Sequence, residues 1–160
     1  MELLHSVDPL LDEVNLELLR LLRRDLRATI AELARGVGMS APSIRERIQR
    51  LEERGILTGF RAEVSPRALG YSISAFVRVR PMPGRLPAVA ELAARMPEVT
   101  ECHRVTGEDC FILRVYLRSL ETLDEVLGAF LVHGQTTTSL IQSSPVPPRD
   151  LPLPGDEGRG

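Results

Sequence analysis

The sequence predicts an α+β protein in which an N-terminal helix-turn-helix (winged-helix-like) domain precedes a ferredoxin-like β-α-β-β-α-β domain. In the first third of the chain, apolar residues recur at the three- and four-residue spacing of amphipathic helices. In the remainder, four extended segments and two helical segments follow one another in the ferredoxin-like order. We place the helix-turn-helix domain at 8–62, a linker strand at 63–70, the ferredoxin-like domain at 71–144 and a disordered, Pro/Gly-rich tail at 145–160.

The first helix is predicted from an apolar stripe. Val14, Leu18, Leu21 and Leu22 recur at helical spacing, and Asp12 stands where an N-cap residue belongs. Such a stripe is buried only when another element packs on it, so we expect further helices beside it.

The next two helices are predicted from their caps. Thr29 and Glu32 form a capping-box pattern, in which two side chains satisfy backbone amides at a helix start reciprocally. Gly36 or Gly38 can end this helix in a left-handed cap, and Ser40 is a good N-cap for the helix that follows. A short helix, a tight glycine-containing turn and a second short helix make up the helix-turn-helix signature.

The third helix gathers arginines on one flank when it is wound at about 100° per residue. This flank suits a recognition helix, whose first residues meet base edges while later ones reach phosphates. The alternative is a solvated amphipathic helix with Arg/Glu pairs, but the capped helix and the glycine turn before it favour binding to double-stranded DNA. The candidate DNA-contact residues are Ser40, Pro42, Ser43, Arg45, Arg47, Arg50, Arg54 and Arg61.

Apolar residues on both faces of the third predicted strand indicate a sheet that is covered twice. Phe111 and Leu113 belong to one face, whereas Ile112 and Tyr116 belong to the other. Two helices cover only one face of a four-stranded sheet, so the other is exposed, unusually polar or covered by another subunit. The apolar residues there favour a dimer built through the sheet.

Two polar segments of this domain are expected to meet at one rim of the sheet. "TGED", residues 106–109, joins the second and third strands, and "GQTTTS", residues 134–139, leads into a fourth strand predicted at 138–144. A carboxylate and a row of hydroxyls would suit a small zwitterion, whose ammonium needs an acid and whose carboxylate needs donors. The alternative for "GQTTTS" is a polar strand entry exposed to water.

Catalytic, metal and cofactor sites are not expected. The three histidines pair with no Cys or Asp at a ligand spacing. The two acids of "TGED" have no accompanying nucleophile, phosphate loop or metal motif, and Cys102 and Cys110 are expected to be small, buried and reduced. No apolar run approaches the ~18 residues that span a bilayer, and the N-terminus lacks the basic start of a signal peptide. We therefore expect a cytoplasmic protein that is not an enzyme and binds no membrane.

Several motifs in register resemble the leucine-responsive/asparagine-type (Lrp/AsnC) transcription regulators over about residues 10–143. They are "LARGVGMS" and "RIQRLEERGIL" in the helical half, and "PEV" and the glycine-acid turn in the second half. The resemblance implies a DNA-binding helix-turn-helix joined by a strand to a ferredoxin-like domain that dimerises through its sheet. It also implies further assembly of the dimers, for example into an octamer, and an amino acid or related metabolite bound between subunits.

Carried over to this chain, the resemblance assigns the effector site to the glycine-acid turn and to the hydroxyl-bearing fourth strand. Two departures stand out. Many relatives have G-x-x-D in the turn where this chain has Cys110 at the last position, which affects the effector geometry. Asn15 replaces an acid of the first helix, which concerns capping or packing. The candidate effector residues are Gly107, Glu108, Asp109, Thr136, Thr137, Thr138 and Ser139.

These features together predict a sequence-specific DNA-binding transcriptional regulator, a homodimer or larger, whose assembly or DNA affinity responds to a small amino-acid-like effector. Two alternatives remain open at this point. The first is an architectural DNA-binding protein without an effector. The second is a metabolic sensor subunit that does not bind DNA, against which the arginine-flanked helix-turn-helix argues.

Overall fold

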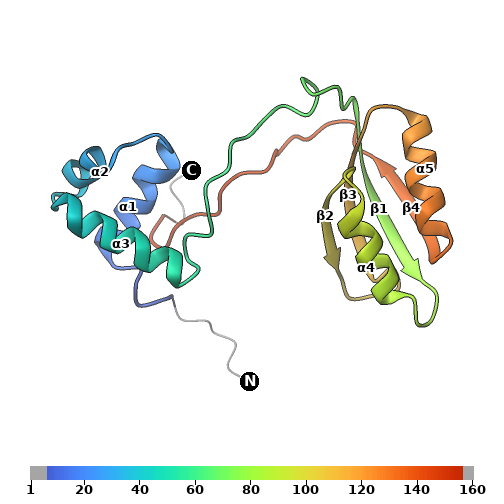
Figure 1. Ribbon diagram of the computed structural model, residues 1–160, viewed down its shortest axis with the longest axis horizontal. Coiled ribbons are helices and arrows are strands. Elements are labelled where there is room, and N and C mark those ends of the chain that lie inside the picture. The colour runs from blue at the N-terminus through green and yellow to red at the C-terminus, as the bar shows by residue number, and fades with distance from the viewer. Residues whose placement is uncertain (1–6, 157–160) are drawn as a thin grey trace. The chain divides into compact units, whose positions relative to one another are not determined.

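The computed structural model describes residues 7–156, and the chain forms two compact units (Figure 1). Among the described residues, the helical unit contains 7–62 together with 148–156. The sheet unit contains residues 63–147. The helix-turn-helix and the antiparallel α+β domain that the sequence predicts are therefore both present.

Each helix of the helical unit begins at a side-chain cap. Asp12 Oδ1 accepts a hydrogen bond from the Asn15 amide at 2.7 Å. Thr29 and Glu32 make both hydrogen bonds of the predicted capping box, and Gly38, at a φ of 70°, ends that helix in the left-handed conformation. The helices are α1 (Glu13–Arg24), α2 (Ile30–Val37) and α3 (Ala41–Glu53).

The three helices surround a small apolar core. Leu18, Ile44 and Leu51 are fully buried, and Leu22 and Leu33 are nearly so. Full burial of one such side chain contributes about 1.5–3 kcal/mol, so this core sets how α2 and α3 pack on α1. The short turn around Gly38 then fixes the start of α3, which confirms the predicted helix-turn-helix.

The C-terminal segment differs from the disordered tail predicted for 145–160. Residues 148–156 belong to the helical unit, and Leu153 is part of that unit's core with only 8% of its surface exposed. The prediction rested on composition, because prolines and glycines without an apolar period are typical of disorder. A single buried leucine produces no such period. Residues 157–160 of the predicted tail lie outside the described part of the chain.

The sheet unit has the ferredoxin-like arrangement, with every pair of neighbouring strands antiparallel. Its elements are β1 (Ile73–Pro81), α4 (Leu86–Arg95), β2 (Val99–Arg104), β3 (Phe111–Leu117), α5 (Leu120–Leu131) and β4 (Gly134–Leu140). The strand order is β2-β3-β1-β4, which places β1 and β3 at the centre and leaves β2 and β4 at the edges.

The alternation of side chains along β1 and β3 divides the sheet into two faces. Val77, Leu113 and Val115 are fully buried and form the core with Val89 of α4 and Phe130 of α5. Because successive side chains of a strand point to opposite faces, the residues between them lie on the side away from both helices, which we call the open face. The open-face residues are Phe76, Arg78, Arg80, Ile112, Arg114, Tyr116, Gln135, Thr137 and Ser139.

The predicted linker strand at 63–70 is wrong. The structure assigns no strand there, and the amides of Leu69 and Tyr71 donate to the carbonyls of Ser65 and Pro66 in a turn. A strand requires a neighbour for its backbone hydrogen bonds, and no other strand among the described residues pairs with this segment.

The fourth strand begins earlier than the 138–144 predicted for it. It runs over Gly134–Leu140, so that "GQTTTS" is the strand itself and does not merely lead into it. Its three threonines are β-branched and suit a pleated strand. Gly134 can start the strand because it lies opposite Pro81, where a side chain has no room.

The two cysteines are less buried than the sequence predicts. Both are free thiols, and Cys102 on the edge strand β2 is exposed, while Cys110 is half-buried. An edge strand has a neighbour on one side only, which explains the exposure of Cys102. Separately, no helix among the described residues has the length and apolar character needed to cross a membrane.

We expect Gly134→Ala to destabilise the sheet unit strongly. An added Cβ would overlap the Arg80 carbonyl oxygen and the Pro81 Cα, and these backbone atoms cannot retreat without breaking the pairing of β1 with β4. Overpacking of this kind costs about 1–3 kcal/mol or more. The matched control is Gly128→Ala at an exposed position of helix α5, where an added Cβ meets nothing within 4 Å and about 0.5–1 kcal/mol of stabilisation is expected. Urea unfolding of both variants measures the difference, and equal stabilities would contradict this packing.

Candidate nucleic-acid interface and effector site

The outer surface of α3 is the side opposite its buried Ile44 and Leu51. At about 100° per residue, Pro42, Glu46, Gln49 and Glu53 lie at the centre of this outer surface, with Arg45 and Arg50 at its two sides, and all six are exposed. Arg45 makes no hydrogen bond or ion pair with any described residue. Its guanidinium is therefore available to an external acceptor.

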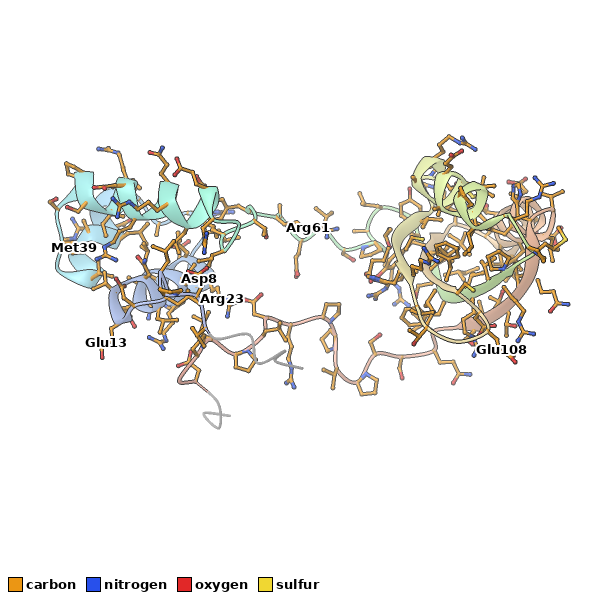
Figure 2. The ribbon with its side chains drawn as sticks, turned by 90° about the horizontal axis from the view of Figure 1, so that it is seen from below. Asp8, Glu13, Arg23, Met39, Arg61 and Glu108 are labelled. Carbon is orange, nitrogen blue, oxygen red and sulfur yellow. The ribbon has the colours of Figure 1, made fainter. Side chains whose placement is uncertain are left out.

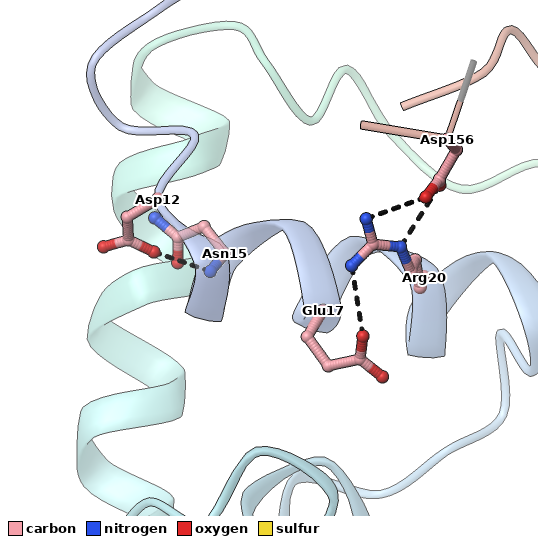
Figure 3. Close-up of polar contacts among 5 residues, drawn as sticks. All are labelled: Asp12, Asn15, Glu17, Arg20 and Asp156. Atoms are coloured by element: carbon pink, nitrogen blue, oxygen red, sulfur yellow. Dashed lines mark hydrogen bonds and ion pairs between the residues drawn. The ribbon is translucent and has the colours of Figure 1, made fainter. Parts of the chain in front are cut away.

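Arg47, a predicted DNA contact, instead connects α3 to the start of α1. Its Nη1 donates to Asp12 Oδ2 at 2.8 Å and to Asn15 Oδ1 at 3.0 Å. Asn15 is only 2% exposed, and its Nδ2 donates to the Leu10 carbonyl at 2.6 Å. Asn15 thus has a packing role, and Figure 3 draws the hydrogen bond from its backbone amide to Asp12.

This network also changes the acidity of Asp12. The Arg47 guanidinium, followed by the Asn15 amide, holds the pKa of the Asp12 carboxyl below its ordinary value of 3.8. Asp12 thus stays ionised at neutral pH and keeps Arg47 in place. A polar cavity of about 270 Å³ lies beside Asp12. It is lined by residues just before and at the start of α1 and by residues of α3, which include Ser43 and Arg50.

The other arginines of the predicted flank also have partners within the helical unit. Arg50 Nη2 lies 2.8 Å from Glu46 Oε1, and Arg54 Nε lies 3.1 Å from Asp8 Oδ2. Both arginines are exposed, so these pairs contribute little and can be exchanged for phosphate.

The serines at the start of α3 serve its cap. Ser40 Oγ accepts from the Ser43 amide at 3.4 Å, and the two hydroxyls lie 2.8 Å apart. Arg61 is exposed beyond the end of the helix. The predicted residues therefore divide between the cap, the packing against α1 and the outer surface, and they do not form one patch.

Gln49 is an exposed residue of α3 that suits a base contact and that the sequence prediction missed. Its Nε2 donates to Glu53 Oε1 at 2.7 Å on the outer surface. Helical winding measured from the buried Ile44 and Leu51 would have found it, since Gln49 lies about 140° from Ile44. The sequence prediction selected arginines by residue type and left out Gln49, although helical winding places Gln49 away from the core.

The acidic turn contacts two arginines of the central strand β1. Glu108 forms an ion pair with Arg80, and Asp109 lies 3.7 Å from Arg78 and 4.0 Å from Arg80. Figure 2 labels Glu108 at the surface of the sheet unit. We call Arg78, Arg80, Glu108 and Asp109 the charged cluster.

The backbone of the turn is held in an unusual conformation. Gly107 has a φ of 107°, and Cys110 has a φ of 59°, which is uncommon for a residue other than glycine. The Val105 amide donates to the Cys110 carbonyl at 2.8 Å and closes the loop. The thiol of Cys110 thereby takes the last position of the turn, and Glu108 and Asp109 supply the carboxylates.

The hydroxyls of β4 do not form a single row. Thr137 lies opposite Arg78 and therefore on the open face, beside the charged cluster. Thr136 lies opposite Val79 and Thr138 opposite Val77, so both are on the helix-covered face and half-buried. Ser139 is on the open face, further from the turn. The two-residue period of a strand separates the predicted set.

Arg78 and Arg80 were absent from the predicted effector residues. The alternation in "YSISAFVRVR" already places both on the face opposite the apolar residues, and it was the available signal. No group of three or more His, Cys, Asp or Glu side chains within residues 7–156 could hold a metal ion.

A helix-turn-helix with an unpaired arginine on its outer helix, in one chain with a small antiparallel α+β unit, defines a DNA-binding transcriptional regulator. Two family models match in the corresponding places: the AsnC-type helix-turn-helix domain over residues 11–52 and the Lrp/AsnC ligand binding domain over residues 74–151. The chain belongs to the Lrp/AsnC family of transcriptional regulators.

Individual relatives agree with this assignment. The HTH-type transcriptional regulator YezC of Bacillus subtilis is 34% identical over 134 residues, which cover 84% of this chain and 95% of the relative. The feast or famine regulatory protein of Mycobacterium tuberculosis, solved in complex with L-methionine, is 33% identical with a TM-score of 0.77, covering 88% of this chain and 98% of that one. A Neisseria meningitidis regulator, also solved with L-methionine, is 26% identical with a TM-score of 0.80, covering 89% and 97%.

We expect the stability of the helical unit to fall in acid partly through Asp12. The folded state lowers the pKa of this carboxyl, so its contribution is present above pH 3.8 and is lost as the pH falls through the lower folded value. Asp12→Asn should be less stable at pH 7 and should lose less stability than the unchanged protein between pH 5 and pH 3. Part of the dependence of the free energy of unfolding on pH should remain in Asp12→Asn, because hydrogen bonds also lower the pKa values of Asp8 and Glu32. Urea unfolding followed by circular dichroism measures it, and an unaltered slope would contradict the role of Asp12.

Proposed function

We propose that this regulator is a homodimer that binds DNA through the outer surface of α3 and binds an amino acid at the charged cluster. The observation that carries the effector assignment is the cluster itself: two arginines and two carboxylates on an exposed part of the sheet, next to the Thr137 hydroxyl. The dimer proposal is based on other residues of the open face, Phe76, Arg114 and Tyr116, which a second copy of the chain could cover. As a regulator of genomic DNA, the protein acts in the cytoplasm.

The DNA-contact proposal rests on which side chains of α3 are free to meet an external partner. Arg45 is exposed and unpaired, and arginine is the usual bidentate reader of guanine. Gln49 lies one turn further on the same surface, and a side-chain amide can read adenine in the same manner. Arg50, Arg54 and Arg61 follow toward the C-terminal end and suit contacts with phosphates.

The effector proposal rests on charge complementarity with a zwitterion. Arg78 and Arg80 can receive the α-carboxylate, while Glu108 and Asp109 can receive the ammonium group. Without a ligand these groups pair with one another across exposed surface, where ion pairs contribute only about 0–1 kcal/mol. An amino acid can therefore replace these pairs at small cost. The methionine complexes of two relatives support an amino acid as the ligand.

The dimer proposal rests on Arg114 at the centre of the open face. Its guanidinium lies between the rings of Phe76 and Tyr116, 5.9 and 5.3 Å from their centroids. Its Nε is buried and has no acceptor within the described residues, and Phe76 is 41% exposed. A second copy packed on this face would bury Phe76 and could supply the missing acceptor. Two copies also double the DNA contacts, and further assembly of dimers remains part of the proposal.

We expect Arg45→Ala and Gln49→Ala to weaken specific DNA binding by about 1–3 kcal/mol each, since each would lose a base contact. Neither residue packs in the core, so the stability of the helical unit should hold. Arg47→Ala should instead lower stability, because Asp12 and Asn15 lose their partner. The measurement is fluorescence anisotropy with DNA from the upstream region of the protein's own gene, with Arg67→Ala as a control that removes an exposed arginine elsewhere. The assignment of Arg45 to DNA contact and of Arg47 to packing would be reversed by one result. In that result Arg47→Ala binds DNA more weakly at unchanged stability, while Arg45→Ala binds DNA as the original chain does.

We expect Thr137→Val to reduce effector affinity about threefold to tenfold, which corresponds to one hydrogen bond of about 0.5–1.5 kcal/mol. Thr138→Val is the matched control on the helix-covered face and should retain the affinity. The ligand is first found by a thermal-shift screen of the common amino acids, L-methionine included, since a ligand of the folded state raises the unfolding temperature. A loss confined to Thr138→Val would place the site on the other face. A screen in which no amino acid acts would favour an architectural DNA-binding protein.

A further inference from the structure

The C-terminal segment returns to the helical unit after the sheet unit is complete. Leu151 and Leu153 are two residues apart in this segment, but Leu151 is 80% exposed and Leu153 only 8%. Leu153 belongs to the same buried apolar cluster as residues of α1, α2 and α3. This contrast shows that the segment presents one defined side to the helices.

Polar contacts hold the segment on both sides of Leu153. Arg20 of α1 donates from Nε and Nη2 to the two carboxylate oxygens of Asp156, at 3.1 and 2.9 Å, while its Nη1 donates to Glu17 (Figure 3). Arg23, one turn further along α1, donates to the Leu151 carbonyl at 2.7 Å. A fork-shaped pair of this kind fixes orientation as well as position.

The segment can dock at a low entropic cost. Prolines at 148, 152 and 154 restrict the unfolded chain, so less conformational freedom is lost when the segment becomes ordered. The Asp156 amide donates to the Leu153 carbonyl at 2.9 Å and closes a turn at the buried leucine. Proline content, which led to the prediction of disorder, here favours a pre-ordered strap.

We propose that residues 148–156 form a strap that is an integral element of the DNA-binding unit and gives it a second covalent connection to the sheet unit. The first connection leaves α3 through residues 54–72, and the second returns from β4 through residues 141–147. Two connections restrict the helical unit more than one linker does. One of these two connections ends on α1, where Arg20 and Arg23 hold it.

The first experiment compares Leu153→Ser with Leu151→Ser in the full chain. These variants make the same chemical change two residues apart, and only the first removes a buried side chain. In Leu153→Ser we expect the unfolding midpoint of the helical unit to fall by about 5 °C, the scale for a lost core contact in a domain of this size. Amide hydrogen exchange should accelerate in α1 and stay unchanged in the strands of the sheet unit. Leu151→Ser should match the original chain in both measurements, and equal behaviour of the two variants would overturn the strap.

The second experiment exchanges the charges of the fork. Arg20→Asp alone and Asp156→Arg alone should each accelerate amide exchange in α1, because each places like charges together. The double variant should recover most of the protection, since it restores an ion pair with the order reversed. Failure of the double variant to recover any protection beyond the single variants would show that the segment is not held at Arg20, and would also overturn the proposal.

Discussion

The alternation of side chains along β1 is the constraint on which the rest of the sheet unit depends. Val77 and Val79 point toward the helices and fill the core, so Arg78 and Arg80 necessarily point to the open face. The turn before β3 brings Glu108 to these arginines. A core requirement on one face thereby places a pair of cations on the other, where an amino acid can reach them.

In the helical unit, ion pairs with carboxylates of the same chain determine which arginines remain available to an external partner. Asp12 takes Arg47 for packing, whereas Arg45 is left unpaired on the outer surface of α3. This division explains why Arg45, in a chain with a net charge of −2, is available to an external partner such as DNA. The strap extends the same principle to α1, since Asp156 takes Arg20. Charge pairing within the fold therefore determines which arginines meet a partner.

Local signals allowed most of the fold to be predicted from sequence. The Thr29 capping box, the left-handed Gly38 and the apolar faces of the strands act within a few residues, and a sequence displays them directly. What sequence could not supply depends on tertiary partners. Leu153 is a single buried residue, so it produces no periodic apolar pattern in the sequence. The segment 63–70 pairs with no strand among the described residues, and the sequence does not display this. The sequence prediction placed all the hydroxyls of β4 in one site because of their residue type. The two-residue period of a strand would already have divided them between the two faces.

The most direct test of the central claim measures DNA affinity with and without the amino acid found by the thermal-shift screen, in the original chain and in Arg80→Ala. We expect the ligand to change the affinity of the original chain severalfold, which corresponds to a coupling of about 1–3 kcal/mol. In Arg80→Ala the ligand should have no effect on the DNA affinity, because its carboxylate loses a partner in the charged cluster. A ligand effect that survives in Arg80→Ala would contradict the assignment of the charged cluster as the effector site.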